Sequence, residues 1–355
     1  MSTSPRSNIT KLQESHNTER SSGIDASTFS EAAVAFTRSY FSGSKISEDA
    51  FGSVVKLIAA DDHFHSIFIS SVVCSEVLER YPIRKSYRRS ILKLLISELE
   101  SINVEVEDAL YATCADCMLD SWDNCFRVFL SKNLDEILVV IRESTQQLCH
   151  GTTGLSLWQA SCDLANFLCQ FADLSGKRIL ELGAGCGLTG IALARSFPVC
   201  SVCLSDYDPK VLSQLEFNIE ENKDKKCSAV SVLNIDWNAF DIKQLSELPD
   251  VVVAADVVYD CSVLPSLCRT IRACLCSSAK SCAYIASTVR DPMTLRTFRD
   301  NLEAHDLRIS DEVQYQYGTF TFLDGSKCRS TSIFPYSSTL DAPTLIFEVV
   351  FDAAR

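Results

Sequence analysis

The sequence has 355 residues, 46% of them hydrophobic and 22% charged, and a formal net charge of −13 at pH 7. Such a length can bury a large core and suffices for two domains. The acidic balance argues against a protein that grips nucleic-acid phosphates, because that grip needs a basic face. The strongest apolar run, residues 250–258, has the length of a strand rather than the ~20 residues that cross a membrane.

The N-terminal residues 1–27 are polar, and they lack the apolar segment of a secretory signal. We expect a disordered tail there, and a cytoplasmic protein without membrane contacts. The seventeen cysteines agree with this location, because they are scattered among expected core elements rather than spaced as a disulfide framework. One group is closer together, but its spacing is not that of a zinc finger, so we expect core packing and no metal. The group is Cys114, Cys117, Cys125, Cys149 and His150.

Residues 28–130 carry helical periodicity, which predicts a helical N-terminal domain. Apolar side chains recur there at three- and four-residue spacing, and two segments begin behind a serine of the capping type. The fourth segment begins with basic residues, Arg88 and Arg89 among them, which the helix dipole disfavours at that end. These cations are therefore either solvated at the surface or held by a partner. The expected helices span residues 29–41, 47–60, 66–81, 85–102 and 105–119.

From residue 131 to residue 355 the pattern changes, and apolar strands alternate with helices. This alternation is typical of a parallel sheet that is covered by helices on both faces. Two last strands, 307–317 and 344–351, are joined by a long polar loop and predict an antiparallel hairpin. The other expected strands span residues 136–144, 178–183, 200–206, 229–235, 250–257 and 282–289, and the expected helices span 157–171, 187–196, 208–222, 262–277 and 292–304.

An apolar strand leads directly into the glycine-rich turn "RILELGAGCGLTG", residues 178–190. Glycines at such a turn let the backbone approach a nucleotide, and both dinucleotide redox enzymes and S-adenosylmethionine-dependent methyltransferases use it. Asp206 ends the next strand about twenty residues further on, where its carboxylate can bind ribose hydroxyls in either class. The turn alone therefore leaves the cofactor open.

Three further features favour S-adenosyl-L-methionine over NAD. Glu181, two residues before the first glycine, suits a cofactor that carries an ammonium and a sulfonium, and it would repel a pyrophosphate. Asp236 can accept a hydrogen bond from an adenine amino group, and Trp237 offers a face on which the ring stacks. The strand at 250–257 ends in "ADVVYD", at the carboxyl edge of the sheet where open α/β folds bind ligands.

The end of that strand reads Asp256-Val257-Val258-Tyr259, and here the sequence resembles the seven-β-strand protein-lysine methyltransferases that carry an Asp-x-x-Tyr motif. The strings "HGTTGLSLWQAS", "PDVVVAADVVY", "STVRDP" and "IFPYSS" are also similar to that family, within residues 80–350. The resemblance implies an α/β fold with a Rossmann-like seven-β-strand sheet, S-adenosyl-L-methionine as cofactor, and a lysine of elongation factor 2 as methyl acceptor. It also implies cofactor contacts from Trp158, Gly183, Ala184, Gly185, Asp206, Trp237 and Ala255.

Asp256 and Tyr259 are the expected catalytic residues. Methyl transfer needs a neutral amine, and a lysine with a pKa of about 10.4 costs about 4–5 kcal/mol to deprotonate at pH 7. We expect Asp256 to bind and aim the incoming ammonium, in a slot walled by Tyr259 whose burial lowers the lysine pKa. A carboxylate by itself stabilises the charged form, so it does not account for the deprotonation.

Each assignment has a structural alternative. Trp158 can be ordinary helix packing, Asp206 can cap the helix that begins at Asp208, and Asp256 can support the adjacent loop. For the whole chain, the alternatives are a methyltransferase of the same fold acting on another protein or a small molecule, an inactive interaction module, and an NAD-dependent dehydrogenase. We expect a monomer with a protein substrate and no direct nucleic-acid partner.

Overall fold

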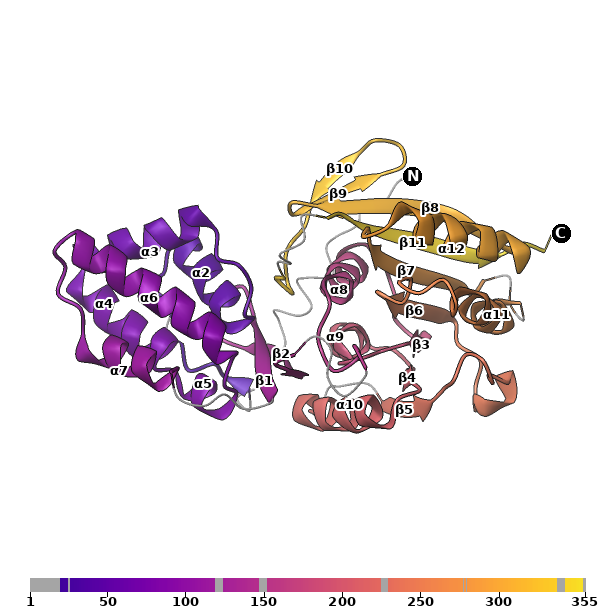
Figure 1. Cartoon of the computed structure of the whole chain (residues 1–355), viewed down its shortest axis with the longest axis horizontal. Coiled ribbons are helices and arrows are strands. Elements are labelled where there is room, and N and C mark those ends of the chain that lie inside the picture. Colours follow the sequence, from indigo (N-terminus) through magenta and orange to yellow (C-terminus); the bar gives the residue numbers. More distant parts are fainter. Residues whose placement is uncertain are drawn as a thin grey trace. The chain divides into compact units, whose positions relative to one another are not determined.

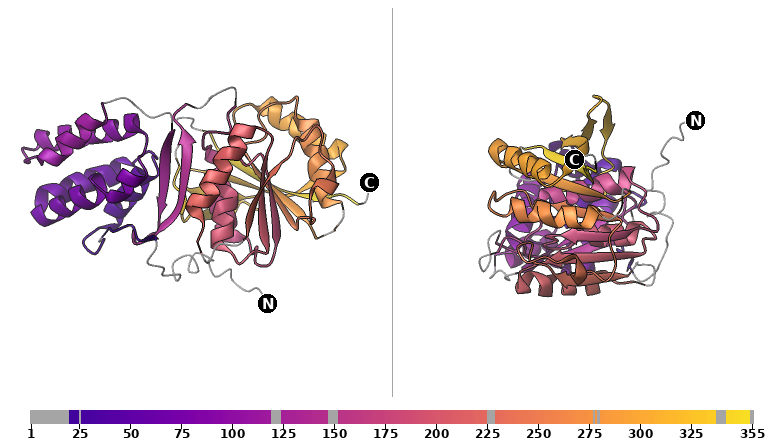
Figure 2. Two further views of the ribbon diagram at one scale, coloured as in Figure 1. Left: turned by 90° about the horizontal axis from the view of Figure 1, so that it is seen from below. Right: turned by 90° about the vertical axis from the view of Figure 1, so that its right-hand side faces the viewer.

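The structure, a computed structural model, describes residues 20–24, 26–118, 124–146, 152–224, 229–276, 278, 280–336 and 342–353. Within those residues the chain forms two compact units (Figures 1 and 2). The helical unit contains the described residues from 20 to 146 together with residues 333–336. The sheet unit contains residues 152–332 and 342–353 with the gaps given above. None of the described helices is long and apolar enough to span a membrane.

The helical unit consists of helices followed by a β-hairpin. Serines cap α2 and α3 at their N-termini, as the sequence predicts (Ser30 and Ser47). The single helix expected over 66–81 is wrong, because a π-helical turn at Ile69–Val73 leads to Ser75, which caps a new short helix. The α-helices are α2 (Glu31–Phe41), α3 (Glu48–Ala60), α4 (Asp62–Phe68), α5 (Glu76–Arg80), α6 (Lys85–Ser101) and α7 (Asp108–Asp116).

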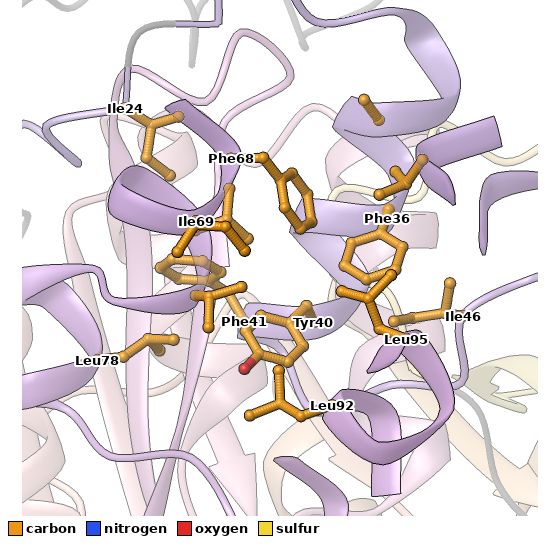
Figure 3. Packing of buried hydrophobic residues seen from close by; sticks show 14 of the residues in the cluster. Ile24, Phe36, Tyr40, Phe41, Ile46, Phe68, Ile69, Leu78, Leu92 and Leu95 are labelled. Carbon is orange, nitrogen blue, oxygen red and sulfur yellow. The ribbon is translucent and has the colours of Figure 1, made fainter. Parts of the chain in front are cut away.

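Aromatic and aliphatic side chains together fill the core of the helical unit (Figure 3). Phe36 of α2 meets Phe68 of α4 edge to face, with ring centroids 5.4 Å apart, and it stacks on Tyr40 at 6.1 Å. Leu92 and Leu95, one turn apart on α6, are buried in the same cluster. Each such side chain contributes about 1.5–3 kcal/mol when fully buried. Packing among α2, α4 and α6 therefore stabilises this unit.

A hairpin moves the domain boundary that the sequence predicts. Strand β1 (Asn124–Leu130) pairs antiparallel with β2 (Ile137–Ser144), so both strands belong to the helical unit. The expected boundary at residue 131 falls between them, whereas the structure keeps both strands in the helical unit. One short strand after a run of helices leaves little periodic signal, and pairing with β1 rather than with the large sheet decides where β2 belongs.

The first described residues are also ordered rather than part of a disordered tail. Ser22 N–H donates a hydrogen bond to the Asp135 carbonyl at 3.1 Å, and Ile24 is buried. Residues 20–24 thus pack beside the turn of the hairpin, which corrects the expectation for this part of 1–27. Residues 1–19 lie outside the described part of the chain.

Residues 333–336 join the helical unit from the far end of the sequence. The Phe334 ring meets the Phe129 ring of β1 edge to face, with centroids 5.4 Å apart. Two side chains of the helical unit, Arg38 and Ser44, donate hydrogen bonds to backbone carbonyls of this segment at 2.9 and 2.6 Å. The segment is therefore an integral part of a unit that is otherwise N-terminal.

Two partly buried arginines of the helical unit bind groups of the same unit. Arg127 of β1 pairs with the buried Glu143 carboxylate at 2.8 Å and donates to the Ser42 carbonyl at 2.8 Å. Arg88 donates to the Val73 carbonyl at 2.6 Å. Arg88 also donates to the Tyr40 hydroxyl at 3.2 Å, so this partly exposed cation has its partners within its own unit.

The sheet unit contains a nine-stranded sheet in the order β10-β9-β8-β11-β7-β6-β3-β4-β5. Strands β5-β4-β3-β6-β7 are parallel, and β11 runs antiparallel between β7 and β8. The seven strands from β5 to β8 confirm the expected Rossmann-like sheet with its closing hairpin, and β9 and β10 occupy part of the expected polar loop. The strands are β3 (Arg178–Leu182), β4 (Ser201–Asp206), β5 (Val230–Asn234), β6 (Val251–Ala255), β7 (Cys282–Thr288), β8 (Leu307–Gln316), β9 (Thr319–Phe322), β10 (Lys327–Arg329) and β11 (Thr344–Phe351).

Helices cover both faces of this sheet (Figure 1). On one face lie α8 (Gln159–Phe171), α9 (Leu188–Ser196) and α10 (Pro209–Asn222), and on the other α11 (Leu264–Leu275) and α12 (Pro292–Ala304). From β3 the chain proceeds outward through β4 to β5 and then returns to β6 on the other side of β3. The carboxyl ends of β3 and β6 therefore flank the switch point, where open α/β sheets bind ligands.

The fifteen cysteines among the described residues are all free thiols, and eight are buried. Cys114 and Cys117 are buried in the helical unit, whereas Cys149 and His150 lie outside the described residues. In the described part of the chain, no group of three or more His, Cys, Asp or Glu side chains is placed to hold a metal ion.

Candidate active site

The glycine turn lies between β3 and α9, at the switch point. Gly183 and Gly185 have φ angles of 61° and 53°, which residues with side chains rarely adopt. A Cβ atom on Gly183 would lie 2.9 Å from Val257 Cγ1 and 3.2 Å from Trp237 Cζ2. The turn therefore packs directly against the chain that follows β6 and β5, and it brings together residues that are far apart in the sequence.

Asp206, at the end of β4, places its carboxylate beside the same turn. It accepts hydrogen bonds from the backbone N–H groups of Gly185 at 3.2 Å and Tyr207 at 2.8 Å. Burial raises the pKa of this carboxyl above its ordinary value, and the backbone hydrogen bonds act in the opposite direction. The helix-cap alternative is wrong, because Asp208 is the residue that caps α10. Carboxylate oxygens accept several hydrogen bonds each, so Asp206 also suits ribose hydroxyls.

Glu181 is buried beneath the turn and binds the start of α9. Its Oε2 accepts a hydrogen bond from the Gly190 N–H at 2.8 Å, and burial raises the pKa of its carboxyl to about 8. A Cβ atom on Gly190 would lie 2.7 Å from that oxygen and 2.1 Å from Leu204 Cδ2. The last glycine of the motif therefore makes room for packing of helix on strand. The expected role of Glu181 toward the cofactor ammonium stays a prediction, since the observed partner is the helix.

The residues expected around adenine follow β5 and end β6. The half-buried Trp237 ring lies against Gly183, whereas Asp236 is exposed and accepts a hydrogen bond from the Asn238 N–H at 2.8 Å. Ala255 is the last residue of β6 and pairs with β7. The structure thus places these residues at the carboxyl edge, and their contacts with the cofactor stay predictions.

Asp256 follows directly after β6 with a φ of 59°, which is uncommon for a residue with a side chain and marks a constrained position. Its side chain is 4% exposed. The Arg290 guanidinium donates to both carboxylate oxygens, at 2.8 and 2.6 Å, and the Thr288 N–H lies 3.4 Å from Oδ1. The expected acceptor carboxylate is therefore at the carboxyl edge, and an arginine holds it.

Trp158 and Tyr259 share a partner in the segment before α8. The indole Nε1 of Trp158 donates to the Thr153 carbonyl at 3.0 Å, and the Tyr259 hydroxyl is hydrogen-bonded to the Thr153 side chain. The Arg290 guanidinium lies over the Trp158 ring, 5.1 Å from its centroid. Trp158 and Asp256 thus both contact Arg290. The expected contact of Trp158 with the cofactor stays a prediction.

Sequence reasoning missed two charged residues of this site. Arg290 lies two residues after β7, within "STVRDP", where the carboxyl-edge rule that located Asp256 applies equally. Asp163 is buried in α8 and accepts a hydrogen bond from Thr344 Oγ1 at 2.6 Å. Burial raises the pKa of Asp163 to about 7. As the single charged residue of α8, Asp163 was visible in the sequence as an exception on an apolar helix.

The donors and acceptors of this site fit S-adenosyl-L-methionine. The positive φ angles of Gly183 and Gly185 turn the chain sharply at the switch point, which is where open α/β sheets bind nucleotides. The Asp206 carboxylate borders the turn, which suits a cationic cofactor better than a pyrophosphate. The fold and the site together are those of an α/β methyltransferase.

Comparison with known proteins identifies the family. Residues 133–305 match the family described as lysine methyltransferase. The chain is 34% identical to the Mus musculus protein-lysine N-methyltransferase EEF2KMT over 231 residues, which are 61% of this chain and 68% of the mouse protein. It is 30% identical to the Homo sapiens protein of the same name over 279 residues, 74% of this chain and 84% of the human protein. The chain belongs to this family of protein-lysine methyltransferases.

The protein is therefore an enzyme that methylates protein lysines, and S-adenosyl-L-methionine is its cofactor. Among solved structures, P. horikoshii TYW2 in complex with MeSAdo is similar, with a TM-score of 0.42 and 13% identity over 78% of this chain and 86% of that chain.

Proposed function

We propose that this enzyme transfers methyl groups from S-adenosyl-L-methionine to a lysine of elongation factor 2, as a monomer in the cytoplasm. Two relatives named EEF2KMT support this substrate, since each aligns with most of this chain. The sequence resemblance at the glycine turn and at Asp256 points to the same branch of the family. The net charge of −13 favours a basic protein surface over nucleic acid as the binding partner.

The observation that carries the proposal is the place of Asp256 relative to the glycine turn. Val257, the residue after Asp256, would touch a side chain on Gly183, so the carboxylate and the turn lie on adjacent strand ends. We assign the turn, Asp206 and Trp237 to the adenosine part of the cofactor. We assign Asp256 and Tyr259 to the binding of the substrate lysine.

The reaction sets two requirements for these residues. When bound, S-adenosyl-L-methionine supplies a methyl group on a positively charged sulfur. The lysine ammonium must first give its proton to water, so that its nitrogen lone pair can accept the methyl group that the cofactor would supply, with the neutral thioether S-adenosylhomocysteine as the leaving group. Asp256 must hold the amine in line for this displacement, and the surroundings must favour the neutral amine.

The test is methyl transfer from radiolabelled S-adenosyl-L-methionine to purified elongation factor 2, with a cell lysate labelled in parallel. We expect one labelled protein, elongation factor 2, and loss of the label with Asp256→Asn. Label on a different lysate protein, with none on the purified factor, would instead support the alternative substrate. In thermal unfolding, S-adenosylhomocysteine should raise the melting temperature and NADH should not, because only a ligand that binds the folded state stabilises it.

A further inference from the structure

Arg290 has no role in the function proposed above, although it binds the carboxylate that we assign to the substrate lysine. Its guanidinium binds Oδ1 and Oδ2 of Asp256 at 2.8 and 2.6 Å, in the two-pronged geometry that an arginine fork offers a carboxylate. The same guanidinium lies over the Trp158 ring. Two independent contacts therefore fix this cation, while its side chain remains 32% exposed at the edge where substrate must arrive.

The carboxylate that Arg290 binds is fixed by the backbone as well. The Asp256 N–H donates to the Ala286 carbonyl at 2.8 Å, and the Thr288 N–H approaches its side chain from β7. The positive φ of Asp256 turns the chain sharply at this point. The ion pair is thus built into the ends of β6 and β7 and is not a mobile surface contact.

The charges around Asp256 decide what happens to the proton of an arriving lysine. Among the described residues, Arg290 from the connection between β7 and α12 pairs with this carboxylate, and the buried Asp163 of α8 interacts with it electrostatically. A negative charge beside the amine holds the proton on nitrogen, and a positive charge weakens that hold. Without Arg290, the site would present only carboxyl groups to the lysine and so would favour the unreactive ammonium.

We propose that Arg290 is a positioning residue of the acceptor site, which fixes the Asp256 carboxylate and offsets its charge so that the lysine amine is received without its proton. This inference rests on the proposed function. It supplies what a lone carboxylate lacks, because Asp256 can still accept a hydrogen bond from a neutral amine while its charge is balanced by Arg290.

The experiment measures the single-turnover rate of methyl transfer to elongation factor 2 as a function of pH for the wild type, Arg290→Gln and Arg290→Lys. In a plot of rate against pH, the rate should rise as the pH increases and the lysine loses its proton. We expect Arg290→Gln to move this rise to a pH about one unit higher, so the rate falls about tenfold near neutral pH and recovers at high pH. Arg290→Lys keeps the charge, so its rise should stay at the wild-type position while the rate falls at every pH because the fork is lost.

Arg299→Gln is the matched control. Arg299 also pairs with a carboxylate, Glu312 at 2.7 Å, and lies 5.0 Å from the centroid of an aromatic ring, Phe347, but α12 carries it outside the site. Its pH profile should match the wild type. Calorimetric affinity for S-adenosylhomocysteine should stay within a few fold for all variants.

Two outcomes would overturn the inference, and they differ. In the first, the wild type labels elongation factor 2, but Arg290→Gln lowers the rate by the same factor at every pH or lowers cofactor affinity and melting temperature together. Arg290 then only supports the fold. If the wild type transfers no methyl group to elongation factor 2, the proposed function fails and the inference fails with it.

Discussion

The two units differ in the ionisable groups that they hold away from solvent. In the helical unit the partly buried guanidinium groups of Arg88 and Arg127 bind backbone carbonyls and the buried Glu143 carboxylate. The sheet unit buries the carboxyl groups of Glu181 and Asp163 and partly buries that of Asp206, and it binds them to backbone N–H groups and a hydroxyl. Each of these groups has a hydrogen-bond partner, which offsets the free-energy cost of removing it from water.

The difference shows how the same physical constraint serves structure in one unit and chemistry in the other. Guanidinium groups stay charged throughout the physiological pH range, so the contacts that those of the helical unit make between segments do not depend on pH. The pKa values of Glu181 and Asp163 lie at about 8 and 7, close to neutrality. Responses to pH and ligand should therefore concentrate in the sheet unit, and loss of a buried cation should affect only the stability of the helical unit.

The largest effect is expected from Arg127→Ala. It removes the closer of the two arginines that pair with the buried Glu143, since Arg84 lies 3.6 Å away, and removing one partner of a buried pair costs about 3–5 kcal/mol. Hydrogen exchange in peptides of the helical unit should accelerate, while affinity for S-adenosylhomocysteine stays unchanged. Arg272→Ala breaks the exposed pair with Asp306 in the sheet unit and should cost less than about 1 kcal/mol. Equal losses for the two variants would contradict the contrast between the units.

Asp256→Asn should be next, with an effect on rate rather than on stability. Loss of the carboxylate charge frees Arg290 and misaligns the amine, and a misplacement of about 1 Å costs about 100-fold in turnover. Affinity for S-adenosylhomocysteine should stay within a few fold. The control is Asp260→Asn, because Asp260 is exposed and outside the pair. Joint loss of melting temperature, cofactor binding and activity would support the loop-supporting alternative. A stable variant with near-normal turnover would exclude both roles.

Asp206→Ala should weaken S-adenosylhomocysteine binding in calorimetry. The lost hydrogen bonds to the ribose hydroxyls are charge-assisted and contribute about 1.5–3 kcal/mol. The matched variant Asp208→Ala removes the cap of α10, which costs about 1 kcal/mol of stability, and leaves the carboxylate beside the turn in place. Unchanged affinity in Asp206→Ala would mean that this carboxylate only braces the glycine turn.

The smallest effect is the pH dependence of stability. The pKa of Glu181 is about 8 in the folded protein and 4.5 ordinarily, so the folded state keeps a proton that the unfolded chain releases between these values. Its stabilising contribution is complete below pH 4.5 and is lost as the pH rises through about 8. From about pH 6 to about pH 8, thermal unfolding of the sheet unit should show a loss of about 1–2 kcal/mol. Glu181→Gln retains an acceptor for the Gly190 N–H and should reduce this dependence of the unfolding free energy on pH. An unchanged dependence would mean that another group causes it.

The sequence was most informative where a backbone rule fixes position. Parallel strands bring their carboxyl ends to one edge, so Asp206 and Asp256 were placed there from strand order alone. The ion pair between Asp256 and Arg290 was not foreseen, because it depends on the direction of two side chains from different loops. Glu181 was expected to face the cofactor, yet its carboxyl group binds α9. The hydrophobic pattern of the strand does not tell which of these two directions the side chain takes.

The helical unit shows the same limit at the level of the fold. Capping serines and apolar spacing predict helices such as α2 and α3 because these signals are local. The interruption at Ile69–Val73 and the hairpin of β1 with β2 arise from packing and pairing at a distance. Residues 333–336, which belong to this unit, carry no local sign of their destination.

That last segment sets an order of events during synthesis. The hydrogen bond from Arg38 to the Ile333 carbonyl joins residues 295 positions apart, and Phe334 packs on Phe129. The ribosome synthesises the N-terminal residues first. The helical unit is therefore complete only after the sheet unit has been translated as far as residues 333–336. Until then, Phe129 lacks the aromatic partner that later covers it. The nascent chain therefore offers chaperones an apolar surface for most of its synthesis, and a fragment that ends before residue 333 has an unfinished helical unit.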